Sequence, residues 1–119
     1  LVVEDSVITR DLIVEIVQAA GYSAVAAENG VDALEQLSLS RPHLVLTDLE
    51  MPRMDGIELT KRIRLTEQAS GARLPIVVIT TRASPEERRA CLNAGADAFL
   101  DKAKFQEGRL LETIRRLIG

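Results

Sequence analysis

Short apolar runs alternate along the chain with longer stretches in which apolar residues recur every three or four positions. The short runs are rich in Val, Ile and Leu without polar alternation, which is typical of strands buried on both faces. The longer stretches are typical of amphipathic helices. Strands are expected at residues 2–4, 23–27, 44–47, 75–80 and 98–100.

Each expected strand is followed by a helical stretch with start and stop signals. The fourth has the clearest start, because Ser84 suits the N-cap and Pro85 suits the first helical position. Two acidic residues follow in its first turn, and Gly95 ends it. Helices are expected at residues 7–20, 30–41, 57–65, 85–94 and 110–118.

Five successive strand–helix units predict a parallel sheet with helices on both faces and right-handed crossovers. A chain of 119 residues is one domain, and a barrel would need about 250 residues. We therefore expect an α/β fold, a doubly wound five-stranded parallel sheet of order 2-1-3-4-5 in a flavodoxin-like three-layer sandwich. The chain opens at Leu1 without an initiator Met, so we expect residues 1–119 to be a domain excised from a longer protein.

The composition narrows the classes of partner. Apolar residues make up 46% and charged residues 28% of the chain, as in globular proteins in water. A net charge of −3 gives no electrostatic reason to expect nucleic-acid binding. No apolar stretch approaches the roughly 20 residues that span a bilayer, so no membrane partner is expected. Cys91 is the single cysteine, which excludes an intramolecular disulfide and fits a cytoplasmic location.

Acidic residues close two of the expected strands. Glu4 and Asp5 end the first strand, and Asp48 ends the third. The carboxyl ends of parallel strands share one edge of the sheet, where α/β proteins bind ligands. Three carboxylates converging there are difficult to sustain without a cation. The pattern therefore indicates metal-assisted chemistry at Asp48.

Two further side chains reach the same edge. Thr80 ends the fourth strand, and Lys102 lies just beyond the fifth. Asp48 can act as the nucleophile and form an acyl phosphate, while Mg²⁺ neutralises charge on the phosphoryl oxygens. Lys102 can pair with another phosphoryl oxygen as a point charge. Thr80 can donate a hydrogen bond to the third oxygen and so report the presence of phosphate.

These residues resemble the receiver domain of two-component response regulators over nearly the whole chain. Each motif alone is weak, but five in the right order at matching strand ends are highly specific. The residues that carry the resemblance are Glu4-Asp5-Ser6, Asp48 with Met51-Pro52 and Met54-Asp55-Gly56, Thr80, Gly95-Ala96-Asp97-Ala98-Phe99, and Lys102.

The resemblance implies that Asp48 accepts a phosphoryl group from a phosphohistidine on a histidine kinase or a histidine phosphotransfer domain. It also implies that Asp5 and Asp48 bind Mg²⁺ (or Mn²⁺) directly. The backbone carbonyl of Glu50 would add a ligand, and Glu4 would act through water. Lys102 would complete the phosphoryl site.

The resemblance further implies a switch in which Thr80 and Phe99 move together on phosphorylation. Their movement would change the face formed by the helix at 85–94, the strand at 98–100 and the helix at 110–118, through which a homodimer can form. Glu50 and Arg82, two positions beyond Asp48 and Thr80, would tune dephosphorylation. An isolated domain of this kind would be no enzyme beyond self-phosphorylation from a donor and slow autodephosphorylation.

The chain departs from the family in two places. Lys102 is followed by Ala103 where the family usually has proline, and Thr80 is followed by Thr81 where the family often has Ala or Ser. The segment 102–114 is similar to the receiver that ends chemotaxis-type hybrid histidine kinases, so we expect such a parent protein. A free-standing or transcriptional response regulator is the alternative.

Other interpretations of the same residues stay open. A haloacid dehalogenase-type phosphatase also uses an aspartyl phosphate, but its motif has a second Asp where this chain has Glu50, and no cap domain is expected within residues 1–119. A degenerate receiver that serves as a non-phosphorylated interaction platform would need none of the site residues. Taken singly, Glu4 and Asp5 could be solvated loop acids, and Phe99 could be an ordinary core residue.

Overall fold

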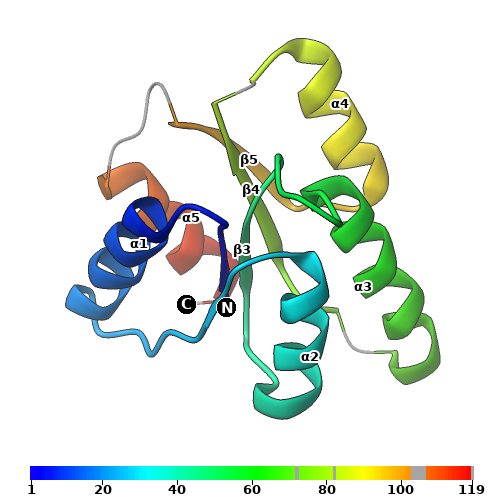
Figure 1. The fold of residues 1–119 in the computed structure, drawn as a ribbon, viewed down its shortest axis with the longest axis horizontal. Helices are drawn as coiled ribbons and strands as arrows, with labels where there is room; N and C mark the ends of the chain where they lie inside the picture. The colour runs from blue at the N-terminus through cyan, green and yellow to red at the C-terminus, as the bar shows by residue number, and fades with distance from the viewer. Residues whose placement is uncertain (72, 82, 103–106, 119) are drawn as a thin grey trace.

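Strands and helices alternate along the chain in the computed structural model, which describes residues 1–71, 73–81, 83–102 and 107–118 (Figure 1). The strands are β1 (Val2–Val3), β2 (Ala26–Ala27), β3 (Val45–Asp48), β4 (Ile76–Thr80) and β5 (Ala98–Asp101). The helices are α1 (Val7–Ala19), α2 (Gly30–Ser40), α3 (Gly56–Ser70), α4 (Pro85–Ala94) and α5 (Glu107–Ile118).

The strands form one parallel sheet in the order β2-β1-β3-β4-β5. This confirms the α/β class and the 2-1-3-4-5 order that the sequence predicts. The direction of winding reverses between β1 and β3, which lie side by side with Val3 paired to Thr47. A ligand site is expected at such a switch point, beyond the carboxyl ends of the two strands.

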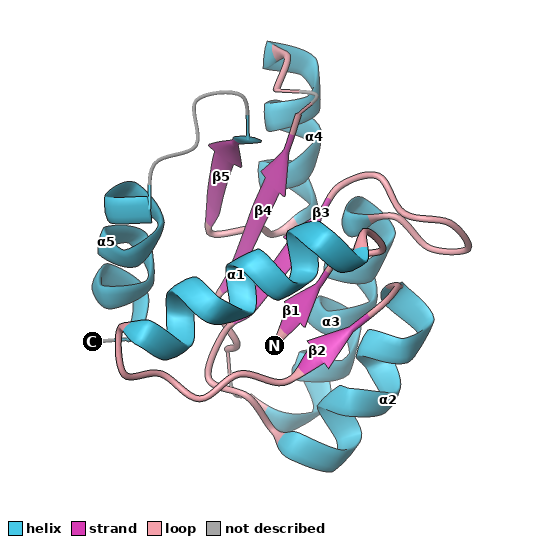
Figure 2. Cartoon of the chain, turned by 60° about the vertical axis from the view of Figure 1, so that its left-hand side comes forward, coloured by secondary structure: helices cyan, strands magenta, loops and turns pink. Residues whose placement is uncertain are grey.

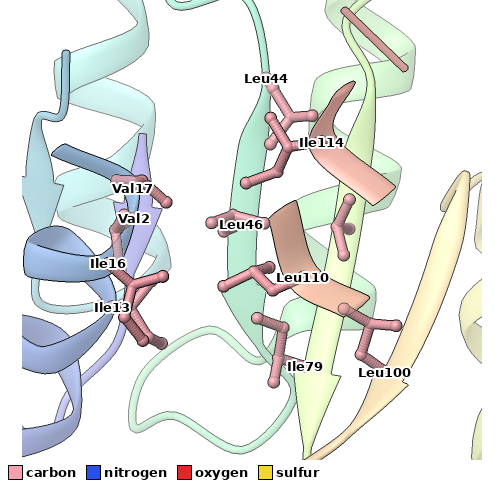
Figure 3. Close-up of a cluster of buried hydrophobic side chains, with 11 residues drawn as sticks. Val2, Ile13, Ile16, Val17, Leu44, Leu46, Ile79, Leu100, Leu110 and Ile114 are labelled. Atoms are coloured by element: carbon pink, nitrogen blue, oxygen red, sulfur yellow. The ribbon is translucent and has the colours of Figure 1, made fainter. Parts of the chain in front are cut away.

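Two layers of helices cover the sheet. Helices α1 and α5 lie on one face, and α2, α3 and α4 lie on the other (Figures 1 and 2). Successive strand residues serve opposite faces, because side chains alternate along a strand. Val2 belongs to the cluster that holds Ile13 of α1 and Leu110 of α5 (Figure 3), whereas Val3 belongs to the cluster that holds Leu59 of α3.

The observed helix starts follow the sequence signals. The Ser84 side chain accepts from the Glu87 amide at the start of α4, and the Asp55 side chain accepts from the Glu58 amide at the start of α3. These caps satisfy backbone donors that have no partner inside a helix. Within the described residues, no helix combines the length and apolar character needed to cross a bilayer.

Some boundaries and burial patterns differ from expectation. Strands β1 and β2 are two residues each, α3 continues to Ser70 rather than ending near Leu65, and α5 begins at Glu107. Ile8 and Leu65 fit the helical apolar spacing, yet they are 84% and 63% exposed. Periodicity locates a helix, but the width of its buried stripe is set by the layer that covers it.

Candidate functional site

Three carboxylates converge where β1 and β3 end. Glu4 and Asp5 directly follow β1, and Asp48 is the last residue of β3. One carboxylate oxygen from each lies within 4.8 Å of the others. Glu4 is buried, Asp48 is partly exposed and Asp5 is exposed. The structure therefore brings Asp48 to Glu4 and Asp5, which lie 43 or more residues before it in the sequence.

Lys102 reaches this cluster from the far side of β4. Its Nζ lies 2.6 Å from Glu4 Oε1 and 3.4 Å from Asp48 Oδ2. The lysine side chain is 18% exposed and that of Asp48 is 11% exposed. One ammonium thus offsets part of the charge of two carboxylates, which leaves a net negative site.

The Asp48 carboxylate is held by its own chain neighbours. The Leu49 amide donates to Asp48 Oδ1 over 2.8 Å, and the Thr47 hydroxyl donates to the Asp48 carbonyl oxygen over 2.9 Å. The Leu49 bond orients the carboxylate at the strand end, and its Oδ2 lies on the side of Lys102. Such an acid is oriented and partly accessible.

Glu4 is the most enclosed member of the cluster. Its residue surface is 2% exposed, and its Oε2 has no hydrogen-bond partner among the described residues. Burial raises the pKa of Glu4 to about 7, the neighbouring Asp48 carboxylate adds to the rise, and Lys102 opposes it. Its carbonyl accepts from Arg10 Nη1 over 2.9 Å.

This donor set fits a hard cation. A buried carboxylate oxygen without a partner is costly, and Glu4 Oε2 is such an atom. Carboxylate and carbonyl oxygens, with water, are the ligands that Mg²⁺ uses. A cation among Glu4, Asp5 and Asp48 would offset the repulsion that their proximity creates.

The two expected switch residues lie on β4 and β5, the strands on the far side of β3 from β1. Thr80 is fully buried at the end of β4, one residue beyond Ile79, the β-sheet partner of Asp48. Phe99 of β5 is partly buried and packs against the cluster that contains Leu49. Phe99 is therefore part of the packing of the core cluster to which Leu49, the residue after Asp48, also belongs.

Glu50 lies in the exposed loop after β3. Together with Asp5, Asp55 and Glu87 it lines an open cavity of about 600 Å³ beside the acid cluster. Two positions of interest lie outside the described residues. They are Arg82, for which the resemblance implies a role in dephosphorylation, and Ala103, which stands where the family usually has proline.

No sequence motif predicts the ion-pair network that lies at the amino end of β5, at the opposite edge of the sheet. Arg64 of α3 donates to the Gly95 carbonyl through Nε and Nη2, over 3.0 and 2.8 Å, and to Asp97 Oδ2 over 2.9 Å. Arg73 binds the other Asp97 oxygen over 2.7 Å. Burial opposes ionisation, but Arg73, the Ile76 amide and Arg64 hold the pKa of Asp97 below its ordinary value.

Comparison with known proteins agrees with this geometry. The family model described as the response regulator receiver domain matches residues 1–115. A gliding motility regulatory protein from Myxococcus xanthus is 38% identical over 117 residues, which are 98% of this chain and 15% of that protein. Response regulator MprA from Mycobacterium sp. (strain KMS) is 41% identical over 118 residues, which are 99% of this chain and 49% of that protein. The chain thus spans half or less of these relatives.

Two solved structures share the fold. Chemotaxis protein CheY4 from Vibrio cholerae has a TM-score of 0.88 and 33% identity, with 98% of this chain and 94% of that chain covered. The receiver domain of sensor histidine kinase PA1611 from Pseudomonas aeruginosa, with a magnesium ion coordinated in its active site cleft, has a TM-score of 0.87 and 30% identity, with 99% and 94% covered.

Proposed function

The chain belongs to the response regulator receiver domain family, and on that premise we propose that Asp48 accepts a phosphoryl group from a phosphohistidine. The donor would be a histidine kinase or a histidine phosphotransfer domain. The observation that carries the proposal is the position of Lys102, whose Nζ contacts both Glu4 and Asp48 within a cluster of three carboxylates. A solvated surface acid would have no such surroundings.

In the transfer, a carboxylate oxygen of Asp48 forms a bond to phosphorus as the bond between phosphorus and the histidine nitrogen breaks. The nitrogen keeps the electron pair of that bond. The Leu49 amide fixes the orientation of the Asp48 carboxylate, and Lys102 is near enough to pair with a phosphoryl oxygen. The protein mainly positions the groups and stabilises charge, as is usual for phosphoryl transfer.

Asp5, Asp48 and the backbone carbonyl of Glu50 would hold Mg²⁺ (or Mn²⁺), and Glu4 would contribute through water. The bound cation would neutralise charge on the phosphoryl oxygens. The support in this chain is the convergence of the three acids and the unpartnered oxygen of Glu4.

We also propose that phosphorylation is reported through Thr80 and Phe99. Thr80 would donate its hydroxyl to the phosphoryl group, and Phe99 would follow. The resulting change would alter the surface of α4, β5 and α5, where a homodimer could form. Phe99 packs against the core cluster that contains Leu49, the residue after Asp48. This packing supports a connection between phosphorylation of Asp48 and movement of Phe99. Glu50 and Arg82 would set the rate of dephosphorylation.

For the parent protein we propose a chemotaxis-type hybrid histidine kinase in the cytoplasm, with residues 1–119 as its receiver domain. The segment 102–114 supports this assignment, and the free Cys91 supports the location. A free-standing or transcriptional response regulator is the second candidate, because MprA is also similar over 99% of the chain. The flanking coding sequence decides: a kinase core upstream of Leu1 supports the first, and a DNA-binding domain after residue 119 supports the second.

The acceptor assignment is tested with acetyl phosphate and Mg²⁺. Mass spectrometry should show addition of one phosphoryl group to the wild-type chain and none to Asp48→Asn. Asp11→Asn is the matched control, because Asp11 is an exposed carboxylate of α1 and its loss should leave labelling unchanged. Labelling of Asp48→Asn would refute the site. No labelling of the wild type would favour an interaction platform.

A further inference from the structure

Gly30, the first residue of α2, is in direct contact with the loop between β3 and α3. A Cβ atom at Gly30 would lie 2.8 Å from both Cβ and Cγ of Met54 and 2.9 Å from its Sδ. Non-bonded carbon atoms sit at about 3.5–4.0 Å. Gly30 is not among the glycines with positive φ, so the position needs glycine for space rather than for backbone conformation.

Met54 is one of two buried anchors of that loop. Leu49 is 4% exposed and Met54 is 9% exposed, whereas Glu50, Pro52 and Arg53 between them are exposed. The anchors belong to different core clusters. The loop's path, including the Glu50 carbonyl, is therefore set by how these two side chains are seated.

Backbone contacts hold the loop tightly against the strand end. The Gly56 amide donates to the Leu49 carbonyl over 2.8 Å, and the Met54 amide donates to the Pro52 carbonyl over 2.8 Å. A Cβ at Gly56 would lie 2.5 Å from the Asp48 carbonyl oxygen. Because the loop is packed this closely, a shift of Met54 would also shift Glu50 or Asp48.

The opposite side of the contact is fixed as well. Asn29 caps α2, with its Oδ1 accepting from the Asp32 amide over 2.9 Å, and Ala33 in the first turn is fully buried. The start of α2 is thus pinned by its cap and by the core. Extra volume at Gly30 would consequently displace the loop rather than the helix.

We propose that Gly30 is a positioning residue for the metal site. Its missing side chain lets Met54 pack against α2, and the packed Met54 holds the loop that carries Glu50, which lines the same cavity as Asp5. This inference rests on the proposed function, because it assigns the loop a role in Mg²⁺ binding. Helix α2 contributes no acid to the cluster of Glu4, Asp5 and Asp48, yet through Gly30 it would help to set the affinity for the metal.

The test compares Gly30→Ala with Gly108→Ala. Gly108 also lies in the first turn of a helix, but a Cβ there would meet no described atom within 4 Å. Mg²⁺ dissociation constants are measured by titration monitored through the backbone amide resonances of residues 49–51 and 53–55, and urea unfolding is measured in EDTA. Gly30→Ala should weaken Mg²⁺ binding by about tenfold, as changes to supporting residues of metal sites do, and should shift these resonances before metal is added. Gly108→Ala should do neither.

Met54→Ala is the second variant and covers the case in which Gly30→Ala does not fold. Losing the Met54 anchor should weaken Mg²⁺ binding. If Gly30→Ala binds Mg²⁺ with wild-type affinity, the inference is wrong, even if this variant unfolds at a lower urea concentration than the wild type. If Gly30→Ala does not fold, wild-type Mg²⁺ affinity in Met54→Ala overturns the inference in the same way. A wild-type chain that does not respond to Mg²⁺ would overturn the proposed metal site itself, and this inference with it.

Discussion

The ammonium nitrogen of Lys102 lies 2.6 Å from Oε1 of Glu4, closer than its 3.4 Å approach to Asp48 Oδ2. The nearer partner of the lysine is thus a buried glutamate rather than the residue that we propose as acceptor. Charge brought to Asp48 by a phosphoryl group would compete with Glu4 for the lysine. The ion pair of Lys102 and Glu4 is therefore expected to be exchanged during the reaction.

Replacing Lys102 should separate metal binding from phosphoryl transfer. Lys102→Ala removes no proposed Mg²⁺ ligand, so the variant should still bind Mg²⁺ at a pH where Glu4 is ionised. The rate of labelling by acetyl phosphate should fall at least about tenfold, because a charge aimed at the phosphoryl group is lost. Lys61→Ala, on the exposed side of α3, is the control. Equal labelling rates for Lys102→Ala and the wild type would remove this lysine from the mechanism.

The affinity for Mg²⁺ should depend on pH through Glu4. Burial, with Asp48 beside it, raises the pKa of Glu4 from its ordinary 4.5 to about 7, so the group must lose a proton before it can serve a cation. Affinity should rise about tenfold between pH 6 and pH 8, and the rise should flatten in Glu4→Gln. Calorimetric Mg²⁺ titrations at pH 6, 7 and 8 measure this. If Mg²⁺ affinity depends on pH equally in the wild type and in Glu4→Gln, a group other than Glu4 causes the pH dependence.

The raised pKa of Glu4 also determines how the free energy of unfolding changes with pH when EDTA removes the metal. Between pH 4.5 and about 7 the folded chain holds a proton on Glu4 that the unfolded chain has released. The contribution of Glu4 to the free energy of unfolding is therefore complete below pH 4.5 and declines as pH rises through this window. Urea unfolding of the wild type and of Glu4→Gln should differ in pH dependence with this sign.

Much of the fold follows from local patterns. Strand order and the meeting of Glu4, Asp5 and Asp48 could be predicted, because buried strands end abruptly at charged residues and parallel strands share one edge. The contact between Gly30 and Met54 could not be predicted, since it depends on how a loop packs against a distant helix. The spacing of apolar residues also did not predict which helix positions are buried, as the exposed Ile8 shows.

Cys91 should be almost inert in the folded chain. It is fully buried in the cluster with Leu49, and burial raises the pKa of its thiol to about 11. Because thiolate is the reactive form, a rise of two pKa units alone reduces it about a hundredfold at pH 8. Iodoacetamide labelling, followed by mass spectrometry with and without urea, should therefore be at least about a hundredfold faster in the unfolded chain. Comparable rates would place Cys91 at the surface.

Arg64 should contribute far more to stability than its neighbour Arg62 on the same helix. Arg64 is 15% exposed in its side chain and binds the Gly95 carbonyl, the Leu74 carbonyl and Asp97. Arg64→Met would leave these partly buried acceptors with fewer donors and should lower the free energy of unfolding by about 2–4 kcal/mol. Arg62 pairs with Glu58 at a side-chain exposure of 54%, so Arg62→Met should cost less than about 1 kcal/mol.

Acid should weaken the contribution of this network. Its partners hold the pKa of Asp97 below the ordinary value, so the stabilisation is present above the unfolded pKa and is lost as pH falls through the folded one. The difference in urea unfolding between Arg64→Met and the wild type should therefore shrink as pH is lowered towards 3. Equal losses for Arg64→Met and Arg62→Met at pH 7 would show that the network joining α3 to the start of β5 adds no stability beyond that of a surface ion pair.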